Sequence, residues 1–409
     1  TLSRRPTMRP PTSKATAAKP MGTASSRLFA TVEPLSSLSS WIGAALLTAN
    51  SIAIVVLAAG PGERGRALGL QSAAQAIGLG VGPAVGGLVL DTLGWQWAFW
   101  INVPFGLVGA VLAWFVLPQT RHLHDAGRFD WTGALLIAPA LTAVAALLNE
   151  GYSWGPSSPA FIACAAAAIV LLVLFVRAER GASTPLIDFS LFRQRAFLNG
   201  NLANYLSYTM LFGVFFLIPF LLVRVYQETA LVAGLRLSIV PMMLGLLAPV
   251  GGALYDRFGA QVVTAAGMMV CVAGLAVLHV FLDGSADGMP MVMLGLVFFG
   301  IGQGLFISPN SSAIMATAPE DLTGEAGSLL NVVRYLGIST GIAGASTLLA
   351  LGIAAGTGSR GTTVDAPASV LVAAADNVIV MLGALGIVAA ALSLLRTVPR
   401  KPRDTPAVE

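Results

Sequence analysis

The chain of 409 residues is 56% hydrophobic and only 10% charged, and its formal net charge at neutral pH is +4. Soluble domains carry about 25% charged residues, so this composition, with a mean hydropathy of +0.80, excludes an ordinary soluble protein. It predicts an all-α protein that crosses the lipid bilayer many times, because a helix satisfies its own backbone hydrogen bonds in lipid.

Apolar runs of about 20 residues are long enough to cross a bilayer as helices, and the chain contains eleven such runs. In chain order they lie at residues 41–59, 67–90, 96–117, 131–149, 159–177, 197–222, 231–254, 262–283, 290–317, 324–352 and 370–396. Short connections rich in Gly, Pro, Asp or Asn separate most of them. Cys164 and Cys271 lie inside apolar runs without metal or disulfide spacing, so we expect both to be packing residues.

Lys and Arg gather on one side of the predicted spans, the side of the C-terminal tail. The positive-inside rule predicts that this side is cytoplasmic and that the chain lies in the plasma (inner) membrane. The residues on this side are Arg64, Arg66, Arg121, Arg128, Arg177, Arg180, Arg193, Arg195, Arg257, Arg396, Arg400, Lys401 and Arg403, against Arg224 and Arg360 on the other. Topology therefore explains the net charge, and no nucleic-acid partner is predicted.

The sequence contains an internal repeat. Residues 42–54 resemble residues 301–314, and residues 64–87 align with residues 323–346. Two related helical bundles in one chain are typical of a secondary transporter whose site lies between the halves. The same offset places the partner of span 262–283 near residues 3–24, which are too polar to cross a membrane.

We therefore expect the chain to lack three N-terminal helices. Residues 1–40 hold six Lys/Arg and one acid, Glu33, and an odd number of spans would leave them outside, against the positive-inside bias. Our hypothesis is that residues 1–40 form an aberrant arm, read out of frame, and that native sequence resumes near Trp41.

The segment "GLGVGPAVGG" fits the motif Gly-x-x-x-Gly-Pro-x-x-Gly-Gly through Gly78, Gly82, Pro83, Gly86 and Gly87. With "ERGRALGL", "WQWAFWINVPFG", "PLIDFSLFRQRAF", "GGALYDRFGAQ" and "NVVRYLGISTG" in the same order, the chain from about residue 41 to its end resembles the fourteen-helix drug:proton antiporters of the major facilitator superfamily.

This resemblance implies a major facilitator fold of two pseudo-symmetric bundles with two extra central helices and an incomplete N-terminal bundle. The implied division is a polar arm at 1–40, three helices of the N-terminal bundle at 41–117, two linker helices and loops at 118–196, a six-helix bundle at 197–396 and a cytosolic tail at 397–409.

The glycines Gly78, Gly82 and Gly86 recur at i, i+4 and i+8, so they line one helix face and permit close approach of a neighbouring backbone. Pro83 cannot donate to the carbonyl of Leu79, so the helix can bend there. We favour an interface between moving halves over a static packing face. The resemblance makes span 231–254, with its prolines and glycines, the opposing element.

The loop "GGALYDRFGAQ" fits the family motif Gly-x-x-x-Asp-Arg-x-Gly through Gly252, Asp256, Arg257 and Gly259. Asp256 is expected to cap the next helix and Gly259 to take a positive φ. In the family this loop also latches helix ends and biases inward against outward opening. A simple tight turn is the alternative, since Asp, Arg and Gly are common in turns.

Polar residues at helical spacing are candidates for a substrate path, or alternatively for hydrogen-bonded contacts between helices. Arg334 lies within a span, and we expect it to face a cavity, to pair with a carboxylate or to serve a structural role. The candidates are Asn50, Gln71, Gln75, Asn204, Tyr205, Tyr208, Gln303, Asn310, Asn331 and Arg334.

The function that this resemblance implies is export of drug-like lipophilic or amphipathic compounds by proton-coupled antiport with alternating access, by a monomer. The alternatives are a dedicated exporter of one metabolite or antibiotic, or an inactive fragment, since the family's membrane aspartate in the first helix is missing. An enzyme is not predicted: His122 and His124 form a weak metal motif, His279 stands alone, and no cofactor is expected. No phosphate-binding Gly-x-x-x-x-Gly-Lys-Ser/Thr loop for ATP-driven transport is present.

Overall fold

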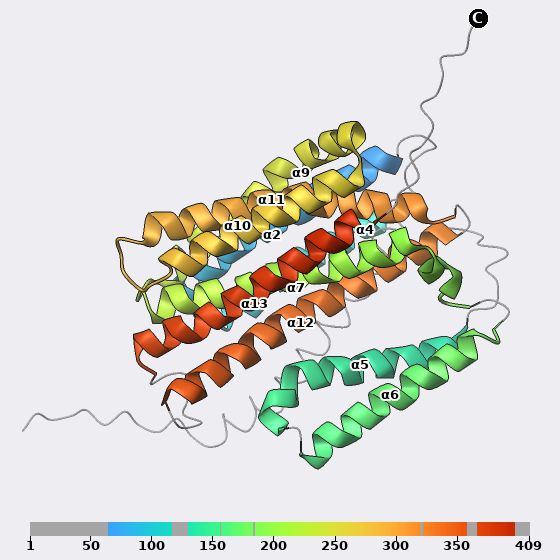
Figure 1. Ribbon diagram of the computed structural model, residues 1–409, viewed down its shortest axis with the longest axis horizontal. Helices are drawn as coiled ribbons and strands as arrows, with labels where there is room; N and C mark the ends of the chain where they lie inside the picture. Colours follow the sequence, from blue (N-terminus) through green and yellow to red (C-terminus); the bar gives the residue numbers. More distant parts are fainter. Residues whose placement is uncertain are drawn as a thin grey trace, which may run out of the picture. The chain divides into compact units, whose positions relative to one another are not determined.

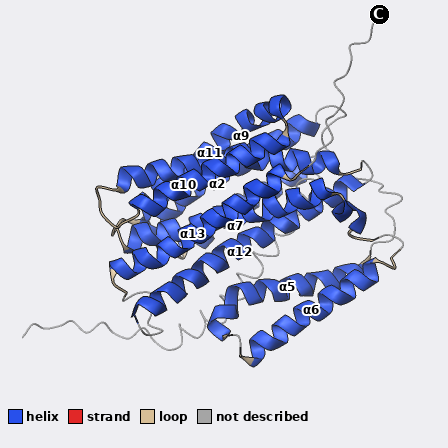
Figure 2. Cartoon of the chain, viewed as in Figure 1, coloured by secondary structure: helices blue, strands red, loops and turns tan. Residues whose placement is uncertain are grey.

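The structure is a computed structural model that describes residues 64–116, 130–155, 157–182, 185–319, 322–357 and 366–396, and all regular elements in these residues are helices (Figure 2). They are α2 (Arg64–Thr92), α3 (Trp97–Trp100), α4 (Asn102–Val116), α5 (Trp131–Trp154), α6 (Pro159–Glu179), the short 3₁₀ helix η1 (Phe189–Arg193), α7 (Arg195–Arg224), α8 (Ala230–Leu237), α9 (Ile239–Phe258), α10 (Ala260–Phe281), α11 (Met289–Thr317), α12 (Thr323–Thr357) and α13 (Ala368–Leu394).

The helices confirm the predicted membrane segments from 131–149 onward, whereas the predicted span 96–117 is divided between α3 and α4. Eight of them, counting α8 and α9 as one, are long and apolar enough to cross a membrane, and α2 and α4 contribute the shorter apolar segments Gly78–Thr92 and Asn102–Leu112. The first predicted span, 41–59, and the arm 1–40 lie outside the described residues.

The predicted span 231–254 is broken in two at Ser238. Pro241 has no backbone N–H to donate to the carbonyl of Leu237, four residues earlier. In addition, the Ser238 hydroxyl donates to the Gly234 carbonyl at 2.9 Å and so takes part in the hydrogen bonding of that turn. Local chemistry that the hydropathy pattern does not register therefore separates α8 from α9.

The hydrophobic core lies among α7, α10, α11, α12 and α13, together with parts of α8 and α9. In Figure 1, α10 lies beside α11 and α13, and α7 lies beside α12 and α13, as their contacts confirm. Met210, Met268 and Phe299 are completely buried there. Cys271 is a free, buried core thiol, as predicted, and its Sγ lies 3.5 Å from the Phe299 carbonyl oxygen.

The helices α10 and α11 approach each other closely through glycine. A Cβ at Gly274 would lie 2.7 Å from the carbonyl oxygen of Gly295, and a Cβ at Gly295 would lie 3.0 Å from that of Gly274. Small residues at a crossing let two backbones touch, which is how helices associate in lipid. These positions fix α10 against α11 within the core.

The α5–α6 hairpin is joined to the core helices by the segment that precedes α7. The Glu179 carboxylate accepts hydrogen bonds from the Leu186 backbone N–H at 3.1 and 3.0 Å. The Glu325 carboxylate, in the first turn of α12, accepts from the Asp188 backbone N–H at 3.0 Å. Two carboxylates from different helices thus hold the same connecting segment.

Candidate functional site

The glycine-proline segment of α2 packs on α8 through backbone atoms. A Cβ at Gly87 would overlap the carbonyl group of Ala230, and a Cβ at Gly234 would overlap the carbonyl group of Pro83. Beside this contact the Asp91 carboxylate accepts a hydrogen bond of 2.8 Å from the Leu231 backbone N–H at the start of α8. The expected partner segment, residues 231–254, does lie against this helix.

The face of α2 that makes the contact differs from the one predicted. Cβ atoms at Gly78, Gly82 and Gly86 would meet no described atom within 4 Å. Contact instead runs along Gly80, which lies near Pro241, and on through Pro83 to Gly87. These positions follow i, i+3 and i+7 spacing and so share a face. The i, i+4 glycine pattern alone did not identify it.

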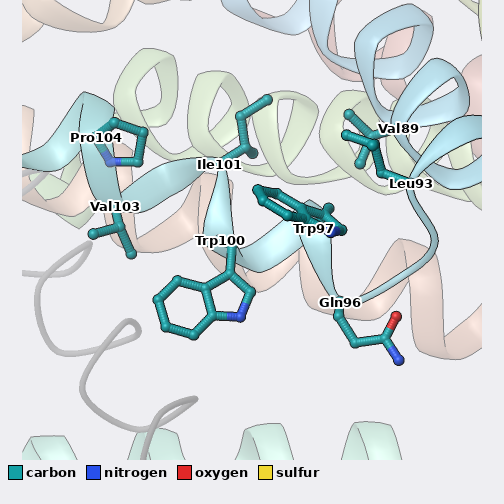
Figure 3. A pocket seen from close by; sticks show the side chains of 8 residues that line it. All are labelled: Val89, Leu93, Gln96, Trp97, Trp100, Ile101, Val103 and Pro104. Carbon is teal, nitrogen blue, oxygen red and sulfur yellow. The ribbon is translucent and has the colours of Figure 1, made fainter.

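Two apolar cavities flank this part of α2. One of about 400 Å³ lies between α2, α7 and α8 and is lined by Gly87, Pro219 and Ala233 among others. The other, of about 610 Å³, lies where α2 meets α3 and α4 (Figure 3). Trp97 and Trp100 line it from α3. Its lining residues are Val89, Leu93, Gln96, Trp97, Trp100, Ile101, Val103 and Pro104.

The loop between α9 and α10 is a tight turn at Gly259. This residue has φ +84°, which confirms the expected positive φ. Asp256 does not cap α10, contrary to the prediction: the N-cap is Gly259, without a side-chain hydrogen bond. Asp256 is exposed, and the exposed Arg257 lies with its guanidinium carbon 5.2 Å from the Phe258 ring centroid. A Cβ added at Gly252 would meet no described atom within 4 Å.

The helices α7 and α12 carry most of the predicted path residues that the structure brings together. The Tyr205 hydroxyl donates to Thr340 Oγ1 at 2.9 Å, and a Cβ at Gly337 would lie 2.6 Å from the Tyr205 carbonyl oxygen. The Thr209 hydroxyl donates to the carbonyl oxygens of Tyr205, at 2.9 Å, and Gly337, at 3.2 Å. Glycine on α12 thus lets the polar face of α7 lie directly against it.

Arg334 lies close to two tyrosine rings, Tyr208 on α7 and its own neighbour Tyr335 on α12. Its guanidinium carbon is 5.8 Å from the Tyr208 ring centroid and 5.4 Å from that of Tyr335. Both distances are within cation–π range. Among the described residues the ion pairs are Arg236 with Glu228 and His279 with Asp376, so Arg334 has no carboxylate partner there. A carboxylate partner, which was one of the three alternatives for Arg334, is absent from this part of the chain.

Two asparagines of the predicted path have unpartnered atoms. Asn204 is 0% exposed, and neither its Oδ1 nor its Nδ2 has a hydrogen-bond partner. The Oδ1 of Asn331, on α12, is also buried without a partner. Buried polar atoms are satisfied in most proteins by protein or water, so these atoms are candidates for contact with water or a ligand.

Gln303 and Asn310 on α11 are completely buried and hydrogen-bonded. The Ser207 hydroxyl donates to Gln303 Oε1 at 2.8 Å, and Asn310 Nδ2 donates to the Gly200 carbonyl oxygen at 3.3 Å. These contacts match the alternative role that we gave the polar residues, as links between helices.

Arg396, which the sequence analysis treated as a topological anchor, is completely buried at the end of α13. Its Nε donates to the Ala196 carbonyl oxygen at 3.2 Å and its Nη2 to Asn310 Oδ1 at 2.8 Å. The carbonyl oxygen of Arg396 accepts a hydrogen bond from Gln261 Nε2. Burial lowers the pKa of this guanidinium to about 10. Its position at the very end of the apolar run 370–396 was the only sequence signal.

His279 does not stand alone, as the sequence suggested. Its Nδ1 contacts Asp376 Oδ1 across α10 and α13, and both side chains are partly exposed. The described residues contain no group of three or more His, Cys, Asp or Glu that could hold a metal ion.

The three remaining path candidates are Asn50, Gln71 and Gln75. Asn50 lies outside the described residues, as do His122 and His124. Gln71 belongs to α2 by its backbone, and Gln75 is exposed on the same helix.

Comparison with known proteins points to one family. Residues 35–342 match the family model of the Major Facilitator Superfamily. The riboflavin transporter RibZ of Clostridioides difficile is 31% identical over 313 residues, which cover 76% of this chain and 66% of that protein. A multidrug resistance protein B homolog of Mycobacterium tuberculosis is 31% identical over 315 residues, covering 75% and 57%. The chain thus spans about three fifths of the length of these relatives.

A solved structure shares the fold. The crystal structure of a bacterial homolog of the human lysosomal transporter Spinster, in an inward-facing and occupied conformation, aligns with a TM-score of 0.51 and 16% identity, covering 85% of this chain and 72% of that one. The helical fold, the glycine-proline contact of α2 with α8 and the family match agree: the chain belongs to the major facilitator superfamily of membrane transporters, which are not enzymes.

Proposed function

We propose that the protein exports drug-like lipophilic or amphipathic compounds across the plasma membrane by proton-coupled antiport with alternating access. The observation that carries this proposal is the backbone contact between α2 and α8 at Gly87 and Gly234. The relatives named as multidrug resistance proteins support the class of cargo. The five-part division given above, a monomeric state and a cytoplasmic C-terminus belong to the same proposal.

The α2–α8 contact suits a surface that opens and closes. Backbone atoms meet there without intervening side chains, so a small rotation of α2 changes many contacts together. Pro83 removes one hydrogen bond from α2 at the contact, which lowers the cost of bending there. The Asp91–Leu231 hydrogen bond is a single polar tie that can break and re-form during such a movement.

The substrate would bind on the α7–α12 face, at Arg334, Tyr208 and Asn204. Rocking one bundle against the other then exposes this fixed site to each side of the membrane in turn. The aromatic rings provide area for an apolar body, and the polar atoms orient it.

Transport in membrane vesicles tests the proposal. Inside-out vesicles that contain the protein should accumulate a fluorescent lipophilic substrate when a proton gradient, acidic inside, is imposed. A protonophore should abolish this accumulation, while ATP with the gradient collapsed should not restore it. Accumulation that survives the protonophore and follows ATP would refute proton coupling.

A dedicated exporter of one metabolite is the second candidate, because one relative carries the name of a riboflavin transporter. Competition separates the two. If many chemically unrelated compounds each inhibit accumulation of the fluorescent substrate, the protein is a multidrug exporter, whereas inhibition by a single compound class would favour the dedicated exporter.

A further inference from the structure

Arg334 is a cation in a membrane-spanning helix whose charge is balanced by no carboxylate among the described residues. By contrast, Arg236 on α8 lies 2.5 Å from the Glu228 carboxylate. Keeping a guanidinium inside a span is costly, and such residues usually mark an ion or substrate pathway. Balancing the charge of Arg334 therefore requires a partner from outside the described residues.

The tyrosine rings leave the hydrogen-bonding edge of this guanidinium available. Cation–π contact uses the flat face of the group, whereas its five N–H donors point outward in the plane. Tyr208 and Tyr335 can hold Arg334 in place through their rings. The Tyr208 side chain also hydrogen-bonds Arg334, which occupies one of these donors, and the others can bind a ligand. A fork of parallel N–H donors matches the two oxygens of a carboxylate.

The register of α7 against α12 brings the unpartnered asparagines close to the level of this arginine. The helices run in parallel, with Gly341 against the Thr209 backbone and Gly337 against that of Tyr205. In this register Asn204 is level with Leu336, two residues beyond Arg334. Asn331 lies about one turn before Arg334 on α12, so unpartnered atoms of both asparagines lie within about one turn of the unpaired charge.

We propose that this α7–α12 site binds compounds that combine a planar aromatic body with a carboxylate. Arg334 pairs with the carboxylate, the Tyr208 ring packs on the aromatic body, and the Asn204 amide hydrogen-bonds a further polar atom of the compound. The inference rests on the proposed transport function and defines a substrate class for the same site. Charge and shape together then distinguish its ligands from neutral lipophilic compounds.

A matched pair of probes tests the class: 2-naphthoate, which carries the carboxylate, and 2-naphthamide, which has the same ring and no charge. Binding of each tritiated probe to the full chain in nanodiscs is measured by scintillation proximity. Charge-assisted hydrogen bonds make naphthoate the tighter ligand by about ten- to a hundredfold. Arg334→Gln should remove that difference and leave naphthamide binding nearly unchanged, whereas Tyr208→Leu should weaken both probes.

Arg236→Gln is the matched control, since it removes another membrane arginine of the same bundle and should leave the naphthoate preference intact. Arg334→Lys keeps the positive charge but loses the pair of parallel N–H donors, so it should retain part of the preference for naphthoate over naphthamide. This variant tests the inference if Arg334→Gln does not fold. Equal binding of the two probes by the unaltered protein, or equal loss of both in Arg334→Gln, would overturn the inference.

The binding test of the substrate class and the transport test of the proposed function can fail independently. Gradient-driven accumulation of a neutral or cationic lipophilic compound tests export without using the carboxylate. Loss of that accumulation with the naphthoate preference intact would count against the transport proposal alone. Retained accumulation without any preference would count against the substrate class alone.

Discussion

The buried Arg396 and its acceptor Asn310 form a pair whose two members should respond differently to substitution. Burial lowers the pKa of the guanidinium to about 10, because removal from water disfavours its charged form. Asn310→Leu removes the acceptor and leaves that charge with one partner fewer. We expect a loss of about 2 kcal/mol in the free energy of unfolding.

Arg396→Met removes the charge itself and should change stability by less than about 1 kcal/mol, because apolar replacements of buried charges are often neutral. In the double variant, Asn310→Leu should then lower the free energy of unfolding by less than it does in the otherwise unaltered protein. Unfolding by SDS titration in mixed micelles measures the cycle, and Arg195→Gln, an exposed arginine at the start of α7, is the control. Additive effects would show that the two residues do not act together.

Glu228, which pairs with Arg236 before α8, should make stability depend on pH. Burial raises the pKa of its carboxyl group, and the neighbouring Arg236 only partly offsets this. A group whose pKa is raised in the folded state binds its proton more tightly there than in the unfolded chain. Its contribution to stability is therefore complete below the ordinary carboxyl pKa and is lost as pH rises through the folded value.

Acidification should therefore raise the melting temperature of the native protein relative to that of Glu228→Gln, although it breaks the ion pair. The difference between the two melting curves across pH 4 to 7 isolates this group. A difference that shrinks on acidification would mean that the ion pair, and not burial, dominates.

At the scale of elements, the α2–α8 contact predicts that substituting either of two glycines on the facing helices reduces transport. Substituting a neighbouring glycine should reduce transport less. Gly87→Ala and Gly234→Ala each place a methyl group onto a carbonyl of the other helix, so α2 and α8 must separate. We expect transport in vesicles to fall about tenfold or more for each variant, while surface expression persists.

Gly86→Ala provides the contrast, since its added Cβ would meet no described atom within 4 Å. It should keep substantially more transport than Gly87→Ala, although both change a glycine of the same motif to alanine. Equal losses in the two variants would show that the motif acts through backbone flexibility and not through this contact.

The sequence predicted the helices better than it predicted their contacts. Hydropathy located α7, α10 and α13 because an apolar run in lipid has only helix open to it. It missed the break at Ser238, which depends on one proline and one hydroxyl. It also missed the burial of Arg396, because that burial depends on Asn310, far away along the chain. Arg334 was identified because charge inside an apolar run is visible without any partner.

For the molecule as a whole, the two ends of the helices carry unequal charge. Arg396 contacts Gln261 and Asn310 at one end, and at the other the Tyr226 hydroxyl accepts from the Gly284 backbone N–H at 3.2 Å. The first end also holds Arg180, Arg193 and Arg257, whereas the described residues near the second include Arg224 and Arg236. The predicted sides of the membrane correspond to these two ends.

The positive-inside rule then predicts that the Arg396 end faces the cytoplasm. Single cysteines at Gln194 and Ala286, both exposed and at opposite ends, report the orientation in a Cys164→Ala background, where Cys271 is buried. A membrane-impermeant maleimide applied to intact cells should label Ala286→Cys and reach Gln194→Cys only after permeabilisation. The reverse pattern would invert the orientation, and with it the direction of transport that we propose, because the same movement of α2 against α8 would then carry substrate inward.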